Sequence, residues 1–308
     1  MLFGLATLVF FLSRLLPGDP SSLFLSPEIP PSVAGQLKSQ FGLDRPLFIQ
    51  YVSWLEAIGK GELGYSFAHG MPVAEVLLRV FPNTAILALS ALLVEVVLAV
   101  SVVGLAVAHV GSTVDRILER LTLLVYSLPS FWIGILLLLI FSFSLRMFPS
   151  SQMYSSGTGG AGEFTSLTDL FAHLVLPTLT VALPGSALLA RYLRSAVTET
   201  LSQEYLLAAR AMGLSNMKLF GLYILPNSFG PVVSVLGIEV GVLLTGVLVT
   251  ETLFSWPGMG RIAVMAIFTR DYPMILGCTL LGGVVVVLAN VGADLLRAVI
   301  DPRVRMSS

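Results

Sequence analysis

The stretch Glu204-Tyr-Leu-Leu-Ala-Ala-Arg-Ala-Met-Gly213, followed by Leu225-Pro226-Asn227, lies between two strongly apolar runs of membrane length. Its charged side chains are costly in hydrocarbon, so the stretch is not expected to lie in lipid. An alanine-rich helix that ends at glycine allows the surface of another protein to approach its backbone closely. The stretch is therefore interpreted as a docking element between two membrane-spanning helices.

The composition indicates an integral membrane protein. Hydrophobic residues account for 56% of the 308 residues and charged residues for only 11%, whereas a soluble domain carries about 25% charged residues. The net charge of −1 and the lack of a basic patch give no indication of nucleic-acid binding. A single cysteine, Cys278, excludes an intrachain disulfide framework and a cysteine-rich metal site.

Six apolar runs predict an all-α protein with six membrane-spanning helices. The first run, residues 1–16, lacks the basic start and the small-residue cleavage site of a signal peptide, so it is expected to remain as a span. Because about 20 residues are needed to cross a bilayer, we expect part of this span to precede Met1. The other five runs are residues 84–110, 121–145, 174–190, 229–249 and 275–298.

The distribution of Lys and Arg predicts the orientation of these spans. One set of short segments, 111–120, 191–218 and 301–308, holds Arg116, Arg120, Arg191, Arg194, Arg210, Lys218, Arg303 and Arg305. The opposite segments, 149–172 and 255–273, hold only Arg261 and Arg270. This excess of basic residues places both termini and the docking element in the cytoplasm.

The chain is expected to form one transmembrane domain over residues 1–308. Residues 1–16 are the first span, 17–82 an extracytoplasmic cap loop, 83–300 a five-span core with the docking loop at about 196–227, and 301–308 a cytoplasmic tail. Within the cap loop, two short helices are predicted at residues 32–41 and 46–58, packed together through Phe41, Phe48, Tyr51 and Trp54.

Helix start and stop signals predict that the docking element is a helical hairpin. Ser202 is a suitable N-cap residue, and Glu204 follows in the first turn, where negative charge suits the helix dipole. Gly213 is suited to the left-handed conformation that ends a helix. Ser215 or Asn216 can then cap a second helix, which is expected to end before the fifth span.

Small side chains define one stripe of the first helix of the hairpin. Tyr205, Ala209 and Gly213 recur at a spacing of four residues and share a face, with Ala208 beside it. This narrow face is the predicted docking surface. The alternative is an ordinary connecting hairpin, which needs no such spacing.

The motif Glu204-Tyr-x-x-Ala-Ala-Arg-Ala-x-Gly213, with Leu225-Pro226 after it, resembles the EAA loop of bacterial ATP-binding-cassette (ABC) importer permeases. More closely, the chain resembles the B-type permease of the dipeptide, oligopeptide and nickel uptake group. Supporting motifs run along almost the whole chain: Leu16-Pro-Gly-Asp-Pro20, Phe41-Gly-Leu-Asp-Arg-Pro46, Ser127-Leu-Pro-Ser-Phe-Trp132, Glu251-Thr-Leu-Phe-Ser-Trp-Pro-Gly-Met-Gly260, Arg270-Asp-Tyr-Pro273 and Asp301-Pro-Arg-Val-Arg305. Their order and spacing make the resemblance specific.

The resemblance implies a type I ABC importer permease fold in the bacterial inner membrane, with six spans and a cytoplasmic coupling helix. In that family the coupling helix seats in a groove of a separate ATPase subunit. Carried over by position, the residues expected to contact the ATPase are Glu204, Tyr205, Ala208, Ala209, Arg210, Gly213 and Pro226. Arg210 is equally consistent with a solvated surface arginine.

The resemblance also implies partners and a cargo. The expected partners are a second, non-identical permease, two cytoplasmic ABC ATPases and an extracytoplasmic solute-binding protein. Peptides are the expected cargo, with nickel or another small solute as alternatives. The rival class is a secondary transporter that needs no ATPase, and such a protein has no use for the docking hairpin.

The sequence does not predict an enzyme. None of its three lysines lies in a Gly-x-x-x-x-Gly-Lys-Ser/Thr motif, so ATP and Mg²⁺ are expected on the partner ATPase and not as cofactors of this chain. The histidines at 69, 109 and 173 share no metal-ligand spacing, and neither a His-Glu-x-x-His nor a Gly-x-Ser-x-Gly motif is present. A catalytic site and a metal site are therefore not expected.

Four acidic residues lie in the apolar runs or near their ends, where ionisable side chains are costly and often functional: Glu95, Glu239, Glu251 and Asp294. Glu251 and Asp294 are expected to pair at helix ends or with loops. Glu239 lies deeper, among glycines, and we hypothesise that it lines the pathway and favours substrates with a cationic group. A carboxyl that only packs between helices is an equal alternative for Glu239, and Glu95 is left unassigned.

Overall fold

The computed structural model describes residues 2–15, 45–66, 68–155 and 163–300. This part of the chain is helical, as predicted, apart from one short pair of antiparallel strands. The elements are α1 (Leu2–Leu15), α3 (Leu47–Gly59), β1 (Tyr65–Ser66), β2 (Met71–Pro72), α4 (Val73–Ala108), α5 (Thr113–Ser127), α6 (Ser130–Leu137), η2 (Leu138–Ser144), α7 (Glu163–Leu201), α8 (Glu204–Ala211), α9 (Asn216–Leu219), η3 (Phe220–Ile224), α10 (Leu225–Gly246), α11 (Leu248–Leu253), α12 (Met259–Phe268) and α13 (Tyr272–Ile300). The helix predicted at residues 32–41 lies outside the described residues.

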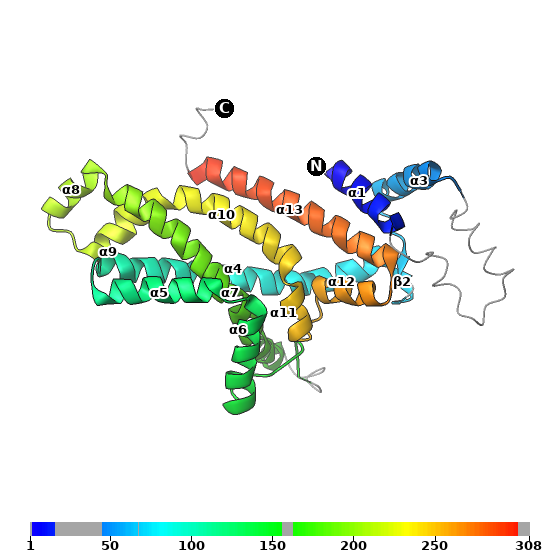
Figure 1. Ribbon diagram of the computed structural model, residues 1–308, viewed down its shortest axis with the longest axis horizontal. Helices are drawn as coiled ribbons and strands as arrows, with labels where there is room; N and C mark the ends of the chain where they lie inside the picture. The colour runs from blue at the N-terminus through cyan, green and yellow to red at the C-terminus, as the bar shows by residue number, and fades with distance from the viewer. Residues whose placement is uncertain (1, 16–44, 67, 156–162, 301–308) are drawn as a thin grey trace.

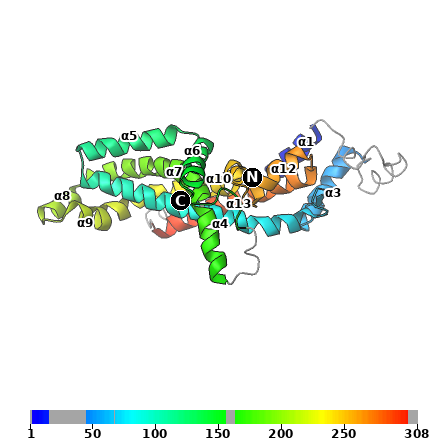
Figure 2. The ribbon, with the colours of Figure 1, turned by 90° about the horizontal axis from the view of Figure 1, so that it is seen from below.

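The long helices form an elongated body (Figure 1). α4 packs along α7, and α10 packs on both α7 and α13. α5 lies beside α7, which is clearest in the view from below (Figure 2). α8 and α9 lie at one end of this body, and α3, α12 and the two strands lie at the other.

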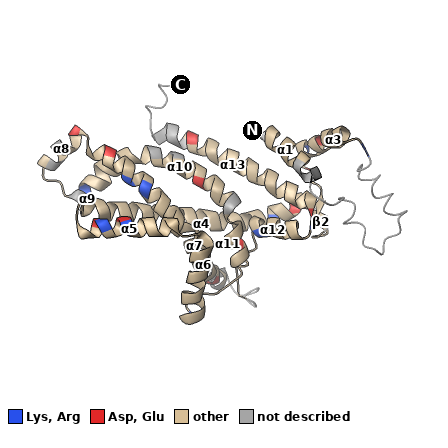
Figure 3. Cartoon of the chain, viewed as in Figure 1, with Lys and Arg blue, Asp and Glu red and all other residues tan. Residues whose placement is uncertain are grey.

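The distribution of side chains confirms that the body belongs in a membrane. Charged side chains gather toward its two ends and are sparse between them (Figure 3). Large apolar side chains are exposed along the long helices, for example Leu93 on α4, Ile238 on α10 and Leu288 on α13. An apolar surface of this extent is not left open to water. It faces lipid or another subunit.

The number of spans differs from the prediction of six. Four described helices are long and apolar enough to cross a bilayer, within Val73–Ala108, Ser166–Leu201, Val235–Leu253 and Tyr272–Leu295. A bent pair, Thr113–Ser127 with Ser130–Ser144, makes a fifth if it is one span. α1 is a helix as predicted, but its 14 residues are fewer than the about 20 that a span needs. Six spans are therefore not confirmed.

The third predicted span, residues 121–145, is not one straight helix. α5 ends at Ser127 and α6 begins at Ser130, with a bend of 102° between them. Pro129 explains the bend, because its ring excludes the preceding residue from the helical conformation and it has no N–H to donate. Leu128 is accordingly extended, with φ −84° and ψ 133°. α6 therefore projects from the body instead of continuing α5 (Figure 1).

The predicted packing between the two cap helices involves Phe41, which lies outside the described residues, but aromatic residues of the second cap helix contact α1. The rings of Tyr51 and Trp54 on α3 lie 5.3 and 5.2 Å from the ring of Phe10 on α1. The hydroxyl groups of Tyr51 and Thr7 are 2.6 Å apart and share a hydrogen bond. Phe48, by contrast, is exposed. The cap helix is thus attached to α1 through one of its faces.

A buried carboxylate joins α4 to α11 and α12. Glu251 accepts hydrogen bonds from the hydroxyl of Thr84 at 2.7 Å and from the backbone N–H of Arg261 at 3.0 Å. The hydroxyl oxygen of Thr84 in turn accepts the N–H of Met259 at 2.7 Å. The first N–H groups of a helix have no partner within it, so these two side chains cap α12. The predicted pairing role of Glu251 at the end of its span is confirmed.

Two glycines allow α12 to fold back onto this carboxylate. A Cβ atom on Gly258 would lie 2.1 Å from an oxygen of Glu251, and one on Gly260 would lie 2.6 Å from the backbone of α11. The adjacent Trp256 is fully buried, and its indole N–H donates to the carbonyl of Asn83 on α4 at 2.9 Å. The Trp-Pro-Gly-Met-Gly part of the motif therefore builds a fixed corner against α4.

Replacing Thr84 with valine keeps the shape of the side chain and removes both of its hydrogen bonds. The Met259 N–H and one oxygen of Glu251 would then be buried without a partner, so we expect the free energy of unfolding to fall by about 2 kcal/mol. The melting temperature of the protein in detergent measures this loss. Thr252→Val is the matched control, because that exposed hydroxyl bonds only to its own helix. An equal loss in both variants would contradict the capping role of Thr84.

Candidate functional site

The predicted docking helix is present, and it ends as predicted. α8 runs over Glu204–Ala211, and Gly213 follows with φ +80°. No atom lies within 4 Å of the position that a Cβ atom on Gly213 would take. Glycine is therefore required there by the left-handed backbone and not by close packing.

The start of the hairpin differs from the prediction. The hydroxyl of Ser202 donates to the carbonyl of Glu199 at 2.7 Å, so Ser202 completes the end of α7 and does not cap α8. The prediction for Ser202 was wrong because this nearby carbonyl of α7 competes for its hydroxyl. Ser215, one of the two predicted caps, accepts the N–H of Lys218 at 3.4 Å at the start of α9.

The second helix of the hairpin does not end before the fifth span. α9 continues through the π-helical turn η3 directly into α10. Pro226 is exposed and lies two residues after η3, within the continuous helix. The docking element and the fifth span are therefore one continuous helical rod.

The predicted small-residue stripe is divided between two environments. Ala209 is only 1% exposed and Leu206 only 2%, and both face the protein core. Tyr205 is 43% exposed, and Glu204 and Gly213 are also exposed. Ala209 therefore does not fit the predicted role of a contact residue. The reason is that the short helix buries its Leu206 side, which carries Ala209 three residues later inward with it.

The exposed face of α8 and of the turn after it consists of Glu204, Tyr205, Ala211, Met212 and Gly213. Met212, which the sequence interpretation did not single out, is 71% exposed. Its position just after the last helical turn, on the side away from the core, could not be inferred without knowing which face is buried. Ala208 and Arg210 are placed within α8 by their position in the helix.

Tight packing attaches α8 to the membrane helices. Leu206 and Ala209 belong to one buried cluster with Val103 of α4, Leu193 of α7 and Phe220 of η3. Gly104 of α4 makes room for this cluster, because a Cβ atom there would lie 3.1 Å from the ring of Phe220. A force on α8 therefore reaches α4, α7 and α10 through close-packed atoms.

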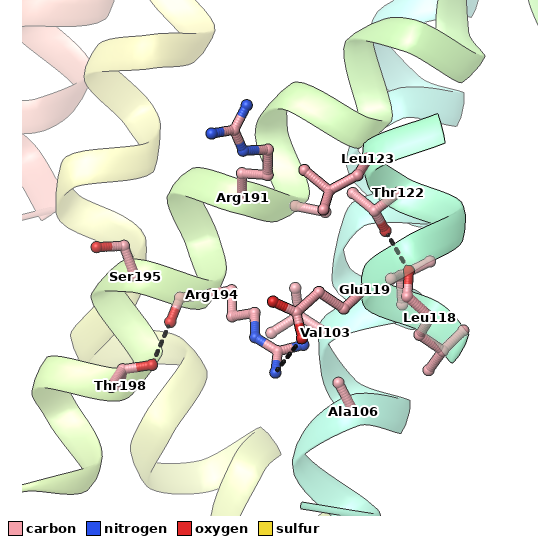
Figure 4. Close-up of a pocket in the computed structure, with 12 residues that line it drawn as sticks. Val103, Ala106, Leu118, Glu119, Thr122, Leu123, Arg191, Arg194, Ser195 and Thr198 are labelled. Atoms are coloured by element: carbon pink, nitrogen blue, oxygen red, sulfur yellow. Dashed lines mark hydrogen bonds and ion pairs between the residues drawn. The ribbon is translucent and has the colours of Figure 1, made fainter. Parts of the chain in front are cut away.

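A cavity of about 300 Å³ lies near α8, between α4, α5 and α7 (Figure 4). Arg194 of α7 reaches across it toward Glu119 of α5, at 3.8 Å, and pairs with Asp115 at 2.9 Å. Arg191, one turn earlier on α7, lies over the ring of Tyr126 at 4.9 Å. These contacts fix α5 to the end of α7 that leads into α8.

A second cavity, of about 330 Å³, lies at mid-length of α4 and α10 and includes both Glu239 and Glu95 in its lining. Gly237 and Gly241 on α10 pack against Ala293 and Val286 of α13, which confirms the expected close helix packing at these glycines. Residues two apart on a helix face opposite sides. Glu239 therefore points away from α13, into the cavity.

Among the residues that the structure describes, no group of three or more His, Cys, Asp and Glu side chains could hold a metal ion. The acidic residues at the two cavities have different surroundings. Glu119 lines the first cavity and faces Arg194, whereas Glu95 and Glu239 share the second cavity with apolar and hydroxyl-bearing side chains.

Family models match nearly the whole chain. Residues 100–306 match the family described as binding-protein-dependent transport system inner membrane component. Residues 1–88 match the N-terminal part of such membrane components.

Relatives are similar to this chain over their full lengths. The chain is 37% identical over 311 residues to a putative peptide permease protein of Brucella suis biovar 1, covering 100% of this chain and 96% of the relative. It is 34% identical to the dipeptide transport system permease protein DppB of Escherichia coli K12, covering 98% and 94% of the two chains. It is 32% identical to the oligopeptide transport system permease protein AppB of Bacillus subtilis 168, covering 99% and 95%.

The fold is shared with solved structures, of which the following is an example. A chain of the MetNI methionine ABC transporter, in an inward-facing conformation, aligns with a TM-score of 0.57 at 16% identity. The alignment covers 73% of this chain and 96% of that chain.

Substitutions at two glycines of the hairpin should have opposite effects on stability. Gly213→Ala forces alanine into a left-handed conformation, and we expect a loss of about 1 kcal/mol in the free energy of unfolding. Gly221→Ala lies in the helical turn η3 with open space around it, and we expect a gain of about 0.5 kcal/mol. Melting temperatures measure both effects. A gain in both variants would show that Gly213 is not constrained.

Proposed function

The chain belongs to the family of binding-protein-dependent transport system inner membrane components and has the type I ABC importer permease fold; on this basis we propose that it is the permease subunit of an ATP-driven peptide importer. The observation that carries the proposal is its similarity, over almost the whole chain, to proteins described as peptide, dipeptide and oligopeptide permeases. These names favour peptides over nickel or another small solute as the cargo.

The exposed face of α8 is the proposed docking surface for a separate ATPase. Glu204, Tyr205, Ala211, Met212 and Gly213 form this face, with Arg210 and Ala208 on the same short helix. ATP and Mg²⁺ would be bound by the ATPase, because the sequence of this chain has no P-loop. The chain itself then forms and breaks no covalent bond.

The packing of α8 suggests how ATP binding would drive transport. Closure of two ATPase subunits would displace α8, and Leu206 and Ala209 would transmit the displacement into the core cluster. Because η3 and α10 form one rod with α9, the fifth span would move with the hairpin. This movement would switch access to the pathway from outside to inside.

The proposed assembly has four kinds of subunit. A second, non-identical permease would complete the pathway, two ATPases would dock in the cytoplasm, and a solute-binding protein would deliver cargo at the opposite end. We place α8 and both termini in the cytoplasm of a bacterial cell because of the excess of basic residues on that side.

The docking surface can be tested by placing a charge on either face of α8. We expect Met212→Asp to lower co-purification of the ATPase at least tenfold without changing the melting temperature, because Met212 is exposed. Ala209→Asp should instead lower the melting temperature, because it buries a charge. Val110→Asp, an exposed residue in the turn after α4, is the matched control. Full ATPase retention by Met212→Asp and by Tyr205→Asp would refute the docking role of this face.

The cargo can be tested with the complete transporter in proteoliposomes. We expect labelled dialanine to accumulate only when ATP is on the side of the membrane that carries the ATPase and the solute-binding protein is on the opposite side. A vesicle without ATP is the control. ATP-dependent accumulation of nickel but not of any dipeptide would overturn the assignment of peptides as cargo, and uptake of dialanine without ATP would support a secondary transporter.

A further inference from the structure

The cavity at mid-length of α4 and α10 contains a carboxyl group that the rest of the fold does not satisfy. Glu95 is 1% exposed, and neither of its carboxyl oxygens has a hydrogen-bond partner in the described structure. Glu251 is buried to the same degree but accepts hydrogen bonds at both oxygens. A buried polar group without a partner is costly, so the position of Glu95 requires a reason other than stability.

The fold makes specific room for this carboxyl group. A Cβ atom on Gly185 of α7 would lie 2.2 Å from one oxygen of Glu95 and 3.0 Å from the other. Any residue other than glycine at this position would displace the group. Ala91 and Ala99, one turn before and one turn after Glu95 on α4, are fully buried. Small residues thus hold α4 and α7 close together around a single large acidic side chain.

Glu239 brings a second carboxyl group to the same cavity from α10. It is half-buried. Among the described residues that line the cavity, none is basic; the polar ones besides the two acids are Tyr126, Ser130 and Thr250. Arg191 contacts the ring of Tyr126 but lines the neighbouring cavity. Two carboxyl groups without a basic side chain beside them offer hydrogen-bond acceptors that a cationic donor of a ligand can satisfy.

We propose that Glu95 and Glu239 form a binding site for the primary ammonium group of a peptide in transit. This inference rests on the proposed function. An ammonium group is compact and has three donors with no acceptor, which suits a cavity with two carboxyl groups, of which that of Glu95 has no hydrogen-bond partner in the described structure. The cavity volume of about 330 Å³ is at the lower end of the range for small-molecule sites. Either the N-terminal ammonium group of a peptide or a lysine side chain has this chemistry.

The site can be tested directly by chemical labelling of the complete transporter. Dicyclohexylcarbodiimide, an apolar reagent that couples to carboxyl groups, should modify Glu95 or Glu239, and mass spectrometry measures the fraction modified. We expect millimolar dialanine to lower this fraction at least fivefold and N-acetyl-dialanine, which has no cation, to leave it unchanged. N-acetyl-alanyl-lysine carries its only ammonium group on the side chain and therefore distinguishes the two sources.

Each outcome of the labelling decides the proposal. Protection by dialanine, by the lysine peptide or by both supports an ammonium site and identifies the group that it accepts. Three results would overturn the proposal: no modification of either residue, equal protection by N-acetyl-dialanine, or no protection at all. Each would show that the two carboxyl groups serve only in packing. Because labelling needs no transport, it reports on the site even if the proposed function fails.

A second measurement uses ATP-driven uptake of dialanine. Removing one charge-assisted contact should slow uptake about tenfold, so we expect this loss in Glu95→Gln and in Glu239→Gln. Gly185→Ala should mimic Glu95→Gln by displacing the carboxyl group. Glu75→Gln, an exposed residue of the same helix α4, is the matched control and should transport at the wild-type rate. Wild-type transport by Glu95→Gln and Glu239→Gln would refute the site while leaving the proposed function intact.

Discussion

The proposed coupling depends on the contact between the buried side of α8 and the membrane helices. Leu206 and Ala209 are buried, and they pack with residues of α4, α7, η3 and α10. An eight-residue helix on its own is not stable in water, so this contact both forms α8 and fixes its orientation. It also determines which residues remain outside to meet a partner. A loop attached only by its ends could provide neither rigidity nor a defined surface.

Two buried carboxyl groups show how the same residue type serves different ends in one apolar body. Glu251 is surrounded by donors from Thr84 and from the first turn of α12, and so it holds a corner of the fold together. Glu95 is just as buried, but none of the residues that the structure describes donates a hydrogen bond to it. The carboxyl group of Glu251 receives its hydrogen bonds from the protein. In the proposed site, the carboxyl group of Glu95 receives them from a ligand that enters the cavity.

The break at Pro129 links the local rules of the backbone to the shape of the second cavity. Because α5 stops and α6 turns away, Ser130 and Tyr126, from the two sides of the break, both line this cavity with Glu95 and Glu239. If the third span were straight, Ser130 and the residues after it would instead continue along the axis of α5. A local restriction on one peptide unit therefore changes which side chains meet in the middle of the protein.

The sequence by itself determined that this is a helical membrane protein, where four of its long apolar helices lie, and that a short helix over Glu204–Ala211 is followed by a turn at Gly213. Each of these depends on composition, periodicity or the conformational freedom of one residue, and all are local properties. Only the tertiary structure decided that Ala209 faces inward, that Ser202 bonds to α7 and that the third span is bent. It also decided that Glu95, which the sequence left unassigned, lies beside Gly185 and shares a cavity with Glu239. The bond of Ser202 and the bend at Pro129 are local, whereas the inward face of Ala209 and the surroundings of Glu95 depend on which faces of distant helices meet, and that is fixed by packing between residues far apart in the chain.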